Sequence, residues 1–183
     1  SMASVVLNQL YSMTMMETVM GCTMLVVDHN RPRVMNLAQV LQAYLDHRME
    51  VLIRKTKFDL AKAQARAHIV EGFLKALDII DEVVNTIRES KTKTDAAEAL
   101  QSKFGFSELQ AAAILEMRLH QLTPLSGVEL ENEMAELNAQ IEYFNSILAS
   151  RDKRIEIIKE ELTDIRTRYA TPRLTEITID DSD

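Results

Sequence analysis

Twelve positions between residues 130 and 169 recur at alternating intervals of four and three, the spacing of the buried seam of a coiled coil. Eleven are apolar and one is Arg151; the set is Leu130, Met134, Leu137, Ile141, Phe144, Leu148, Arg151, Ile155, Ile158, Leu162, Ile165 and Tyr169. A run of this length predicts helix. Ser126 and Glu129 have capping-box spacing at its start, and Pro172 cannot continue it. We therefore expect a helical arm over residues 127–170.

A second long helix is predicted upstream, over residues 36–90. Asn36 and Gln39 resemble a capping box, and only Gly72 interrupts the sequence before Lys91. A helix of about 54 residues is some 80 Å long at 1.5 Å per residue. Its distal half has a seam with coiled-coil spacing, at Ile69, Phe73, Ala76, Ile80, Val83 and Ile87, and its middle has small residues, at Ala61, Ala63, Ala65 and Ala67.

Only about 35 residues connect the two long helices, so we expect them to fold back as an antiparallel coiled-coil pair. The connector, residues 91–126, then forms a small helical head at the far tip. Residues 3–35 predict a base with a short helix over 5–20 and a hairpin over 22–35, and residues 171–183 add a strand-like tail to it. The predicted fold class is mainly α, with a small α/β base.

The head is predicted to contain two helices. Thr94 can cap a short one over 95–103 that ends at Gly105, and Ser107 with Gln110 forms a capping box for the next. The second helix is apolar on two sides. We assign one side to the core of the head, at Leu109, Ala112, Leu115, Leu119 and Leu122. We assign the other to a homodimer interface, at Gln110, Ala113, Ile114, Met117 and Gln121. The alternative is a fully buried helix in a monomeric core.

The composition limits the cellular setting. The single Cys22 excludes an internal disulfide framework and suits a reducing cytoplasm. No apolar run approaches the roughly 18 residues of a membrane span. The net charge of −7 argues against a chain covered by nucleic acid, yet residues 37–66 carry a local excess of basic side chains and residues 126–150 carry only acidic ones. This polarity is usual for solvated helix surface. It also fits a polyanion that is tolerated near the base and repelled near the tip.

The sequence offers no catalytic or metal site that we can find. Its four histidines lie far apart, and no phosphate-binding glycine loop or nucleophile elbow occurs. Arg168 and Tyr169 could form a tyrosine nucleophile, but Tyr169 closes the coiled-coil seam, so packing explains it.

Four segments, taken together, resemble one known family. They are FDLAKAQARAHIVEGFLKALDIIDEVVNTIRES (58–90), FGFSELQAAAILEMRLHQLTPL (104–125), IIKEEL (157–162) and RLTEI (173–177). The order, the spacing and the residues of these segments resemble those of the A subunits of bacterial DNA gyrase and topoisomerase IV. The resemblance extends over nearly the whole chain. The resemblance is weaker over 126–155.

The resemblance implies the exit gate (C-gate) of a type IIA DNA topoisomerase, an ATP-dependent isomerase, through which a transported duplex leaves. It implies a homodimer through the head, between whose copies DNA passes transiently, and an ATPase B subunit that binds ATP elsewhere. It also implies magnesium-binding carboxylates outside this segment and a cytoplasmic, nucleoid-associated location. The family's catalytic Arg-Tyr pair lies N-terminal to this segment, so Arg168 and Tyr169 do not correspond to it. The basic residues Arg48, Arg54, Lys55 and Lys57 would lie nearest the DNA core.

Two other interpretations remain open from the sequence. A structural coiled-coil dimerisation module of a chromosome-organising protein would share the dimer but lack a base at 5–35. A small helical enzyme would need a concave polar site.

Overall fold

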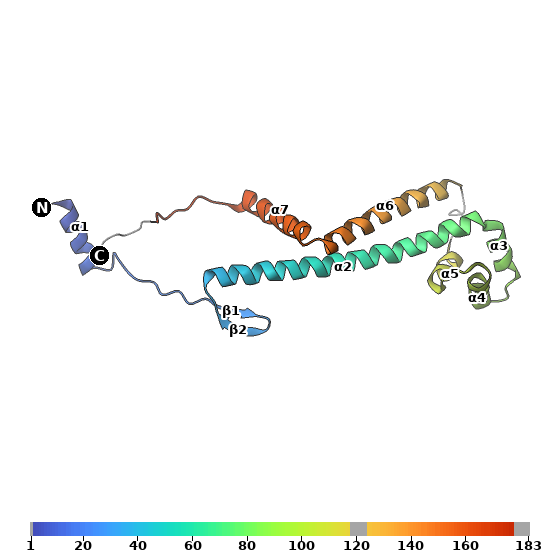
Figure 1. Ribbon diagram of the computed structural model, residues 1–183, viewed down its shortest axis with the longest axis horizontal. Helices are drawn as coiled ribbons and strands as arrows, with labels where there is room; N and C mark the ends of the chain where they lie inside the picture. The colour runs from blue at the N-terminus through green and yellow to red at the C-terminus, as the bar shows by residue number, and fades with distance from the viewer. Residues whose placement is uncertain (1, 118–123, 178–183) are drawn as a thin grey trace. The chain divides into compact units, whose positions relative to one another are not determined.

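The computed structural model describes residues 2–117 and 124–177 (Figure 1). The fold is mainly α-helical with one two-stranded sheet, as predicted. The chain divides into two compact units, Ser1–His47 and Arg48–Asp183, and the long helix α2 (Leu37–Asp78) contributes to both.

The first unit contains helix α1 (Ala3–Met13) and an antiparallel hairpin of β1 (Leu25–Asp28) and β2 (Arg31–Val34). The strands pair from Leu25 opposite Val34 to Asp28 opposite Arg31. His29 and Asn30 make the turn with φ of 47° and 60°, and the left-handed region suits a tight two-residue hairpin. The predicted hairpin is confirmed. The first helix ends at Met13, earlier than the predicted residue 20.

Helix α2 begins as predicted. The backbone N–H of Gln39 donates to Asn36 Oδ1 at 2.8 Å, and the Asn36 N–H donates to Gln39 Oε1 at 3.0 Å. The predicted continuation to residue 90 is wrong, because the helix is interrupted at Ile79 (φ −120°, ψ 34°) and resumes as α3 (Ile80–Glu89). The interruption redirects α3, and Val83 is then buried in the hydrophobic core of the second unit.

The return arm is also two helices, α6 (Pro124–Ala149) and α7 (Arg151–Tyr169), separated by Ser150. Ser150 Oγ caps α7 by accepting from the Lys153 N–H at 3.2 Å. The Arg154 guanidinium satisfies the end of α6 by donating to the carbonyls of Ile147 and Leu148, at 2.8 and 2.6 Å. The helix begins at Pro124 rather than at Ser126, whose side chain lies outside the described ones. Proline suits a first helical turn because its missing N–H would be unpaired there.

Contacts within the second unit establish that α6 and α7 return antiparallel to α2. Arg66 pairs with Glu133 on α6, and Arg48, earlier on α2, pairs with Glu161 on α7. Between them, one shallow hollow is lined by residues 59–66 of α2 and by residues 137–144 of α6. The predicted antiparallel arrangement is confirmed.

Two short helices connect the arms, α4 (Lys93–Phe104) and α5 (Glu108–Leu115). Thr92, not Thr94, caps α4, because its Oγ1 accepts from the Asp95 N–H at 3.1 Å. Gly105 ends α4 in the left-handed conformation (φ 68°), as predicted. The strand predicted for the tail does not form over residues 171–177. The head, predicted over residues 91–126, also takes in α3, so α3, α4 and α5 together are called the head.

Candidate functional site

The head has its own hydrophobic core, which fastens it to the end of α2. Six side chains from α2, α3, α4, α5 and the α4–α5 connection are buried together: Ala76, Val83, Leu100, Phe106, Ala111 and Ile114. Lys75 on α2 adds a polar contact, since its Nζ donates to the Phe104 carbonyl at 2.6 Å and lies 4.9 Å from the centre of the Phe106 ring. The head is therefore held by α2 itself.

A group of four residues, which we call the polar joint, fixes α5 against α2: His68, Gly72, Ser107 and Gln110. The predicted capping box is present, with Gln110 N–H to Ser107 Oγ at 3.1 Å and Ser107 N–H to Gln110 Oε1 at 3.0 Å. The Gln110 amide also donates to the His68 carbonyl at 2.8 Å, and His68 Nε2 lies 2.7 Å from Ser107 Oγ. These bonds satisfy a polar side chain that is only 7% exposed.

Gly72 allows this close approach. A Cβ atom at position 72 would lie 2.7 Å from Gln110 Cγ, closer than real Cβ contacts come. Because Gln110 is held by its bonds to α2 and to Ser107, it cannot easily move away. Position 72 therefore sets the distance between α2 and α5.

Four of the α5 assignments are exchanged between the two faces relative to the prediction. Leu109 (68% exposed) and Ala112 are exposed, so placing them in the core was wrong. Gln110 and Ile114 (6% exposed) are buried in the same chain, so placing them at a dimer surface was wrong. The polar joint explains the exchange, because it turns Gln110 toward α2.

The other α5 assignments have separate outcomes. Leu115, expected in the core, is half-buried and packs against it. Ala113 and Met117 are half-buried at the edge of the exposed face and stay predicted contact residues. Leu119, Gln121 and Leu122 lie outside the described residues.

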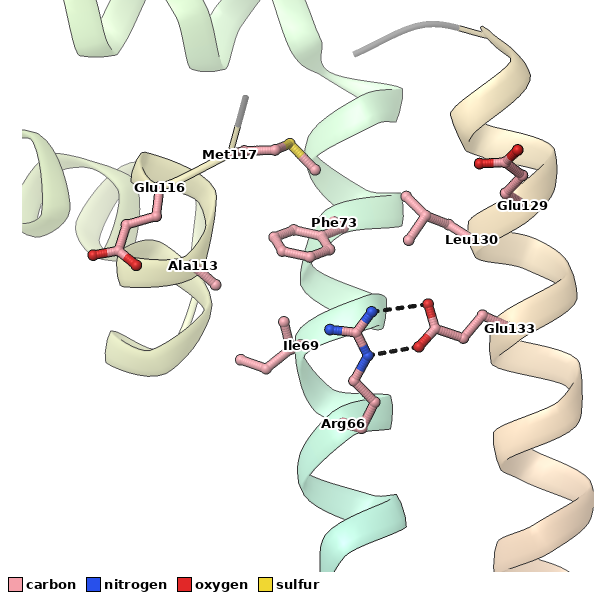
Figure 2. A pocket seen from close by; sticks show the side chains of 9 residues that line it. All are labelled: Arg66, Ile69, Phe73, Ala113, Glu116, Met117, Glu129, Leu130 and Glu133. Atoms are coloured by element: carbon pink, nitrogen blue, oxygen red, sulfur yellow. Dashed lines mark hydrogen bonds and ion pairs between the residues drawn. The ribbon is translucent and has the colours of Figure 1, made fainter. Parts of the chain in front are cut away.

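A hollow of about 470 Å³, which we call the head groove, lies where α2, α5 and α6 meet (Figure 2). Figure 2 shows Ile69 and Phe73 pointing from α2 toward α5, and Leu130 pointing from α6 toward α2. The groove is lined by five apolar side chains and four charged ones: Ile69, Phe73, Ala113, Met117, Leu130, Arg66, Glu116, Glu129 and Glu133.

The charged pair in the groove ties the two arms together. Arg66 donates from Nε and Nη2 to the two carboxylate oxygens of Glu133, at 2.6 and 2.9 Å (Figure 2). This hydrogen bonding lowers the pKa of Glu133 below its ordinary value, although partial burial opposes the shift, and it raises the pKa of Arg66. A two-pronged pair of this kind fixes geometry as well as charge.

The four basic residues expected nearest DNA differ in their surroundings. Arg48 is half-buried and paired with Glu161, so its charge is already compensated. Arg54 is exposed and lies 3.7 Å from Glu50, while Lys55 and Lys57 are exposed.

No catalytic arrangement emerges from the described residues. They contain no group of three or more His, Cys, Asp and Glu side chains that could hold a metal ion. His68 and Ser107 are close enough for a base and nucleophile, but His68 Nδ1 faces the Gln110 amide at 3.5 Å rather than a carboxylate, and Ser107 Oγ serves as a helix cap. Tyr169, expected to close the coiled-coil seam, is 74% exposed. Among the described helices, none has the length and apolar character needed to span a membrane.

Comparison with known proteins gives one consistent family. The family model for the A subunit of DNA gyrase/topoisomerase IV matches residues 1–163. The DNA gyrase A subunit of Chlamydia muridarum is 45% identical over 181 residues, which are 99% of this chain and 22% of that protein. The DNA gyrase A subunit of Streptococcus pneumoniae serotype 4 is 45% identical over 177 residues, which are 97% of this chain and 22% of that protein. The chain thus spans about a fifth of the length of these relatives.

Proposed function

Because the chain belongs to the family of DNA gyrase/topoisomerase IV A subunits, we propose that it forms the exit gate, or C-gate, of an ATP-dependent type IIA DNA topoisomerase. The complete enzyme would bind ATP and Mg²⁺ in other parts, would have the ATPase B subunit for its partner, and would work in the cytoplasm on the nucleoid. This segment would supply mechanics and no catalytic residue. The family favours this role over that of a dimerisation module in a chromosome-organising protein.

The exposed face of α5 carries the proposal. Leu109 and Ala112 present apolar surface on a head that is already anchored by its own core and by the polar joint. The head is therefore well packed without this apolar surface. An identical head across a two-fold axis would cover it. We place Leu109 and Ala112 at the centre of this contact, with Ala113 and Met117 at its edge.

The size of this contact suits a gate. Burying one leucine side chain contributes about 1.5–3 kcal/mol, so the two copies of Leu109 supply part of the association energy and their apolar neighbours supply the rest. A contact of that size can hold and still separate repeatedly. Larger obligate interfaces would resist opening.

The distribution of charged side chains along α2 and α6 supports the passage of a DNA duplex between two copies of the chain. Glu131 and Glu136 are exposed on α6, near its head end, while Lys55 and Lys57 are exposed on α2 toward the other end. A duplex would be repelled by the acidic end and would not remain bound beside the contact.

Substitution of Leu109 by aspartate tests the gate contact. We expect the unmodified chain to be a dimer by multi-angle light scattering, and Leu109→Asp to be a monomer with unchanged helical circular dichroism. Phe58→Asp is the matched control, since Phe58 is also exposed but lies on α2 away from the head, and it should stay dimeric. A monomeric unmodified chain would remove the gate assignment.

A further inference from the structure

The head groove extends beyond the centre of the proposed gate contact and shares only Ala113 and Met117 with its edge, and we propose that it is a binding site for a small molecule with an aromatic ring and one protonated amine. Its volume of about 470 Å³ falls in the range of small-ligand pockets, about 300–1,000 Å³. Its lining also has the usual composition of such pockets, apolar side chains with a few polar groups.

The apolar part of the groove fits an aromatic ring. Phe73 and Ile69 form the wall on α2 toward α5, Leu130 points toward α2 from α6, and Met117 reaches across from the end of α5 (Figure 2). Aromatic rings pair favourably with each other in offset or edge-on geometry, and the methionine thioether adapts to the edge of a ring.

The charged part of the groove selects a cation. Three carboxylates and one guanidinium line it, and Arg66 is already engaged by both oxygens of Glu133. Glu116 lies 3.2 Å from Lys93 in an exposed pair. Glu129 is an exposed carboxylate of the lining and supplies a negative charge for an ammonium group. A carboxylate or phosphate ligand would meet net negative charge instead.

The site is separate from the groups that hold the head in place. None of the groove residues belongs to the polar joint or to the six buried core residues, and only Phe73 also packs against that core. A ligand can thus contact α2, α5 and α6 together without displacing the contacts that fix α5. Such a ligand would link the head to the return arm.

Methionine methyl NMR on the full chain tests the proposal. The chain is labelled with ¹³C-methyl methionine and titrated at pH 7 with 3-phenylpropylammonium, the neutral 3-phenylpropanol and the anionic 3-phenylpropanoate. The Met117 signal should shift with the ammonium at a concentration at least about five-fold lower than with the alcohol, and should not shift with the carboxylate. Met49, on α2 outside the groove, is the internal control.

Two variants distinguish the contribution of the Glu129 charge to binding from that of the apolar groove. Glu129→Gln should weaken the ammonium about two- to five-fold, the size of an exposed ion pair, and leave the alcohol unchanged. Glu131→Gln is the matched control, because Glu131 is an exposed carboxylate of the same helix outside the lining. Equal binding of ammonium and alcohol, or an unaffected Glu129→Gln, would overturn the assignment of a cation.

The remaining outcomes of the NMR titration show what, if anything, fills the head groove. Absence of any Met117 shift with all three probes would overturn the site. A Met117 signal that responds only in the monomeric Leu109→Asp variant would mean that a second copy fills the groove, which also overturns it. These readouts are independent of topoisomerase activity, so the gate and the ligand site can fail separately.

Discussion

At the scale of single residues, Gly72 and Gln110 decide how the head meets the arm. Gly72 leaves room that Gln110 occupies, and the Gln110 amide uses that position to reach the His68 carbonyl. A buried glutamine without such a partner would be costly, since an unsatisfied buried polar group destabilises by about 1–3 kcal/mol. Volume and hydrogen bonding are therefore coupled at one contact.

Gly72→Ala should destabilise the second unit despite the better helix propensity of alanine. The added methyl group overlaps Gln110 Cγ, and overpacking of this kind typically costs about 1–3 kcal/mol, more than the gain of about 1 kcal/mol from replacing a helical glycine. Urea unfolding followed by circular dichroism measures the net loss. Gly127→Ala is the matched control, because its nearest neighbour, Leu77 Cδ1, would lie at an ordinary 3.9 Å, and it should be neutral or stabilising.

Sequence reasoning predicted some residue roles and missed others for a physical reason. The capping boxes at Asn36 and Ser107 and the left-handed Gly105 are local arrangements, so neighbouring residues were enough to predict them. The faces of α5 depend on a partner 42 positions away, since Gln110 is buried by its bond to the His68 carbonyl. An alanine-rich helix with apolar residues on both sides gave no local signal for that choice.

At the scale of elements, the two arms are interrupted where the predicted helices were continuous. The break at Ser150 had a signal, because Arg151 is the one position where the coiled-coil seam is not apolar. The break at Ile79 had none, since no side chain caps α3 there. The seam on the distal part of α2 and on α3 also serves the head, where Ala76 and Val83 are buried in its core.

Removing the Arg154 guanidinium should loosen the junction of α6 and α7. It donates two charge-assisted hydrogen bonds to carbonyls that end α6, and bonds of this type contribute about 1.5–3 kcal/mol. Arg154→Met should lower the urea midpoint accordingly. Arg151→Met, an exposed neighbour, should change the free energy of unfolding by less than about 0.5 kcal/mol. Equal effects of both variants would contradict a capping role for Arg154.

The Arg66–Glu133 pair should make the contact between α2 and α6 sensitive to acid. The pKa of Glu133 is lowered in the folded chain, so its stabilising contribution is present above the pKa of an unfolded glutamate, about 4.3, and is lost as the pH falls through the lowered value. Both side chains are partly exposed, which keeps the contribution below about 1 kcal/mol.

Urea unfolding at pH 7 and in acid tests this dependence. Glu133→Gln should be less stable than the unmodified chain at pH 7, and the difference should disappear in acid. The control Glu136→Gln removes an exposed carboxylate from the same helix and should stay within about 0.5 kcal/mol at pH 7. A difference that persists in acid would assign the effect to packing.

At the scale of the whole molecule, the proposed gate depends on how charge is distributed over the complete enzyme. Reversing Glu131 and Glu136 to lysine should slow duplex release and lower the turnover of strand passage in the proposed complete enzyme several-fold, more strongly at low salt, because exposed charges act within about 10 Å at 0.1 M salt. Reversal of Glu156 and Glu160, exposed on α7, is the control with the same change in net charge and should have a smaller effect. Unchanged turnover in the first variant would discard repulsion of DNA as part of the mechanism.

The absence of a side chain at Gly72 has one more consequence. Positions 72 and 110 draw on a single shared space, so a larger residue at one demands a smaller residue at the other. A serine at position 110 could accommodate alanine at position 72, but it would be too short to bond the His68 carbonyl. The two positions must therefore change as a pair, and every such pair gives up either the close approach of α2 and α5 or the hydrogen bond that orients α5.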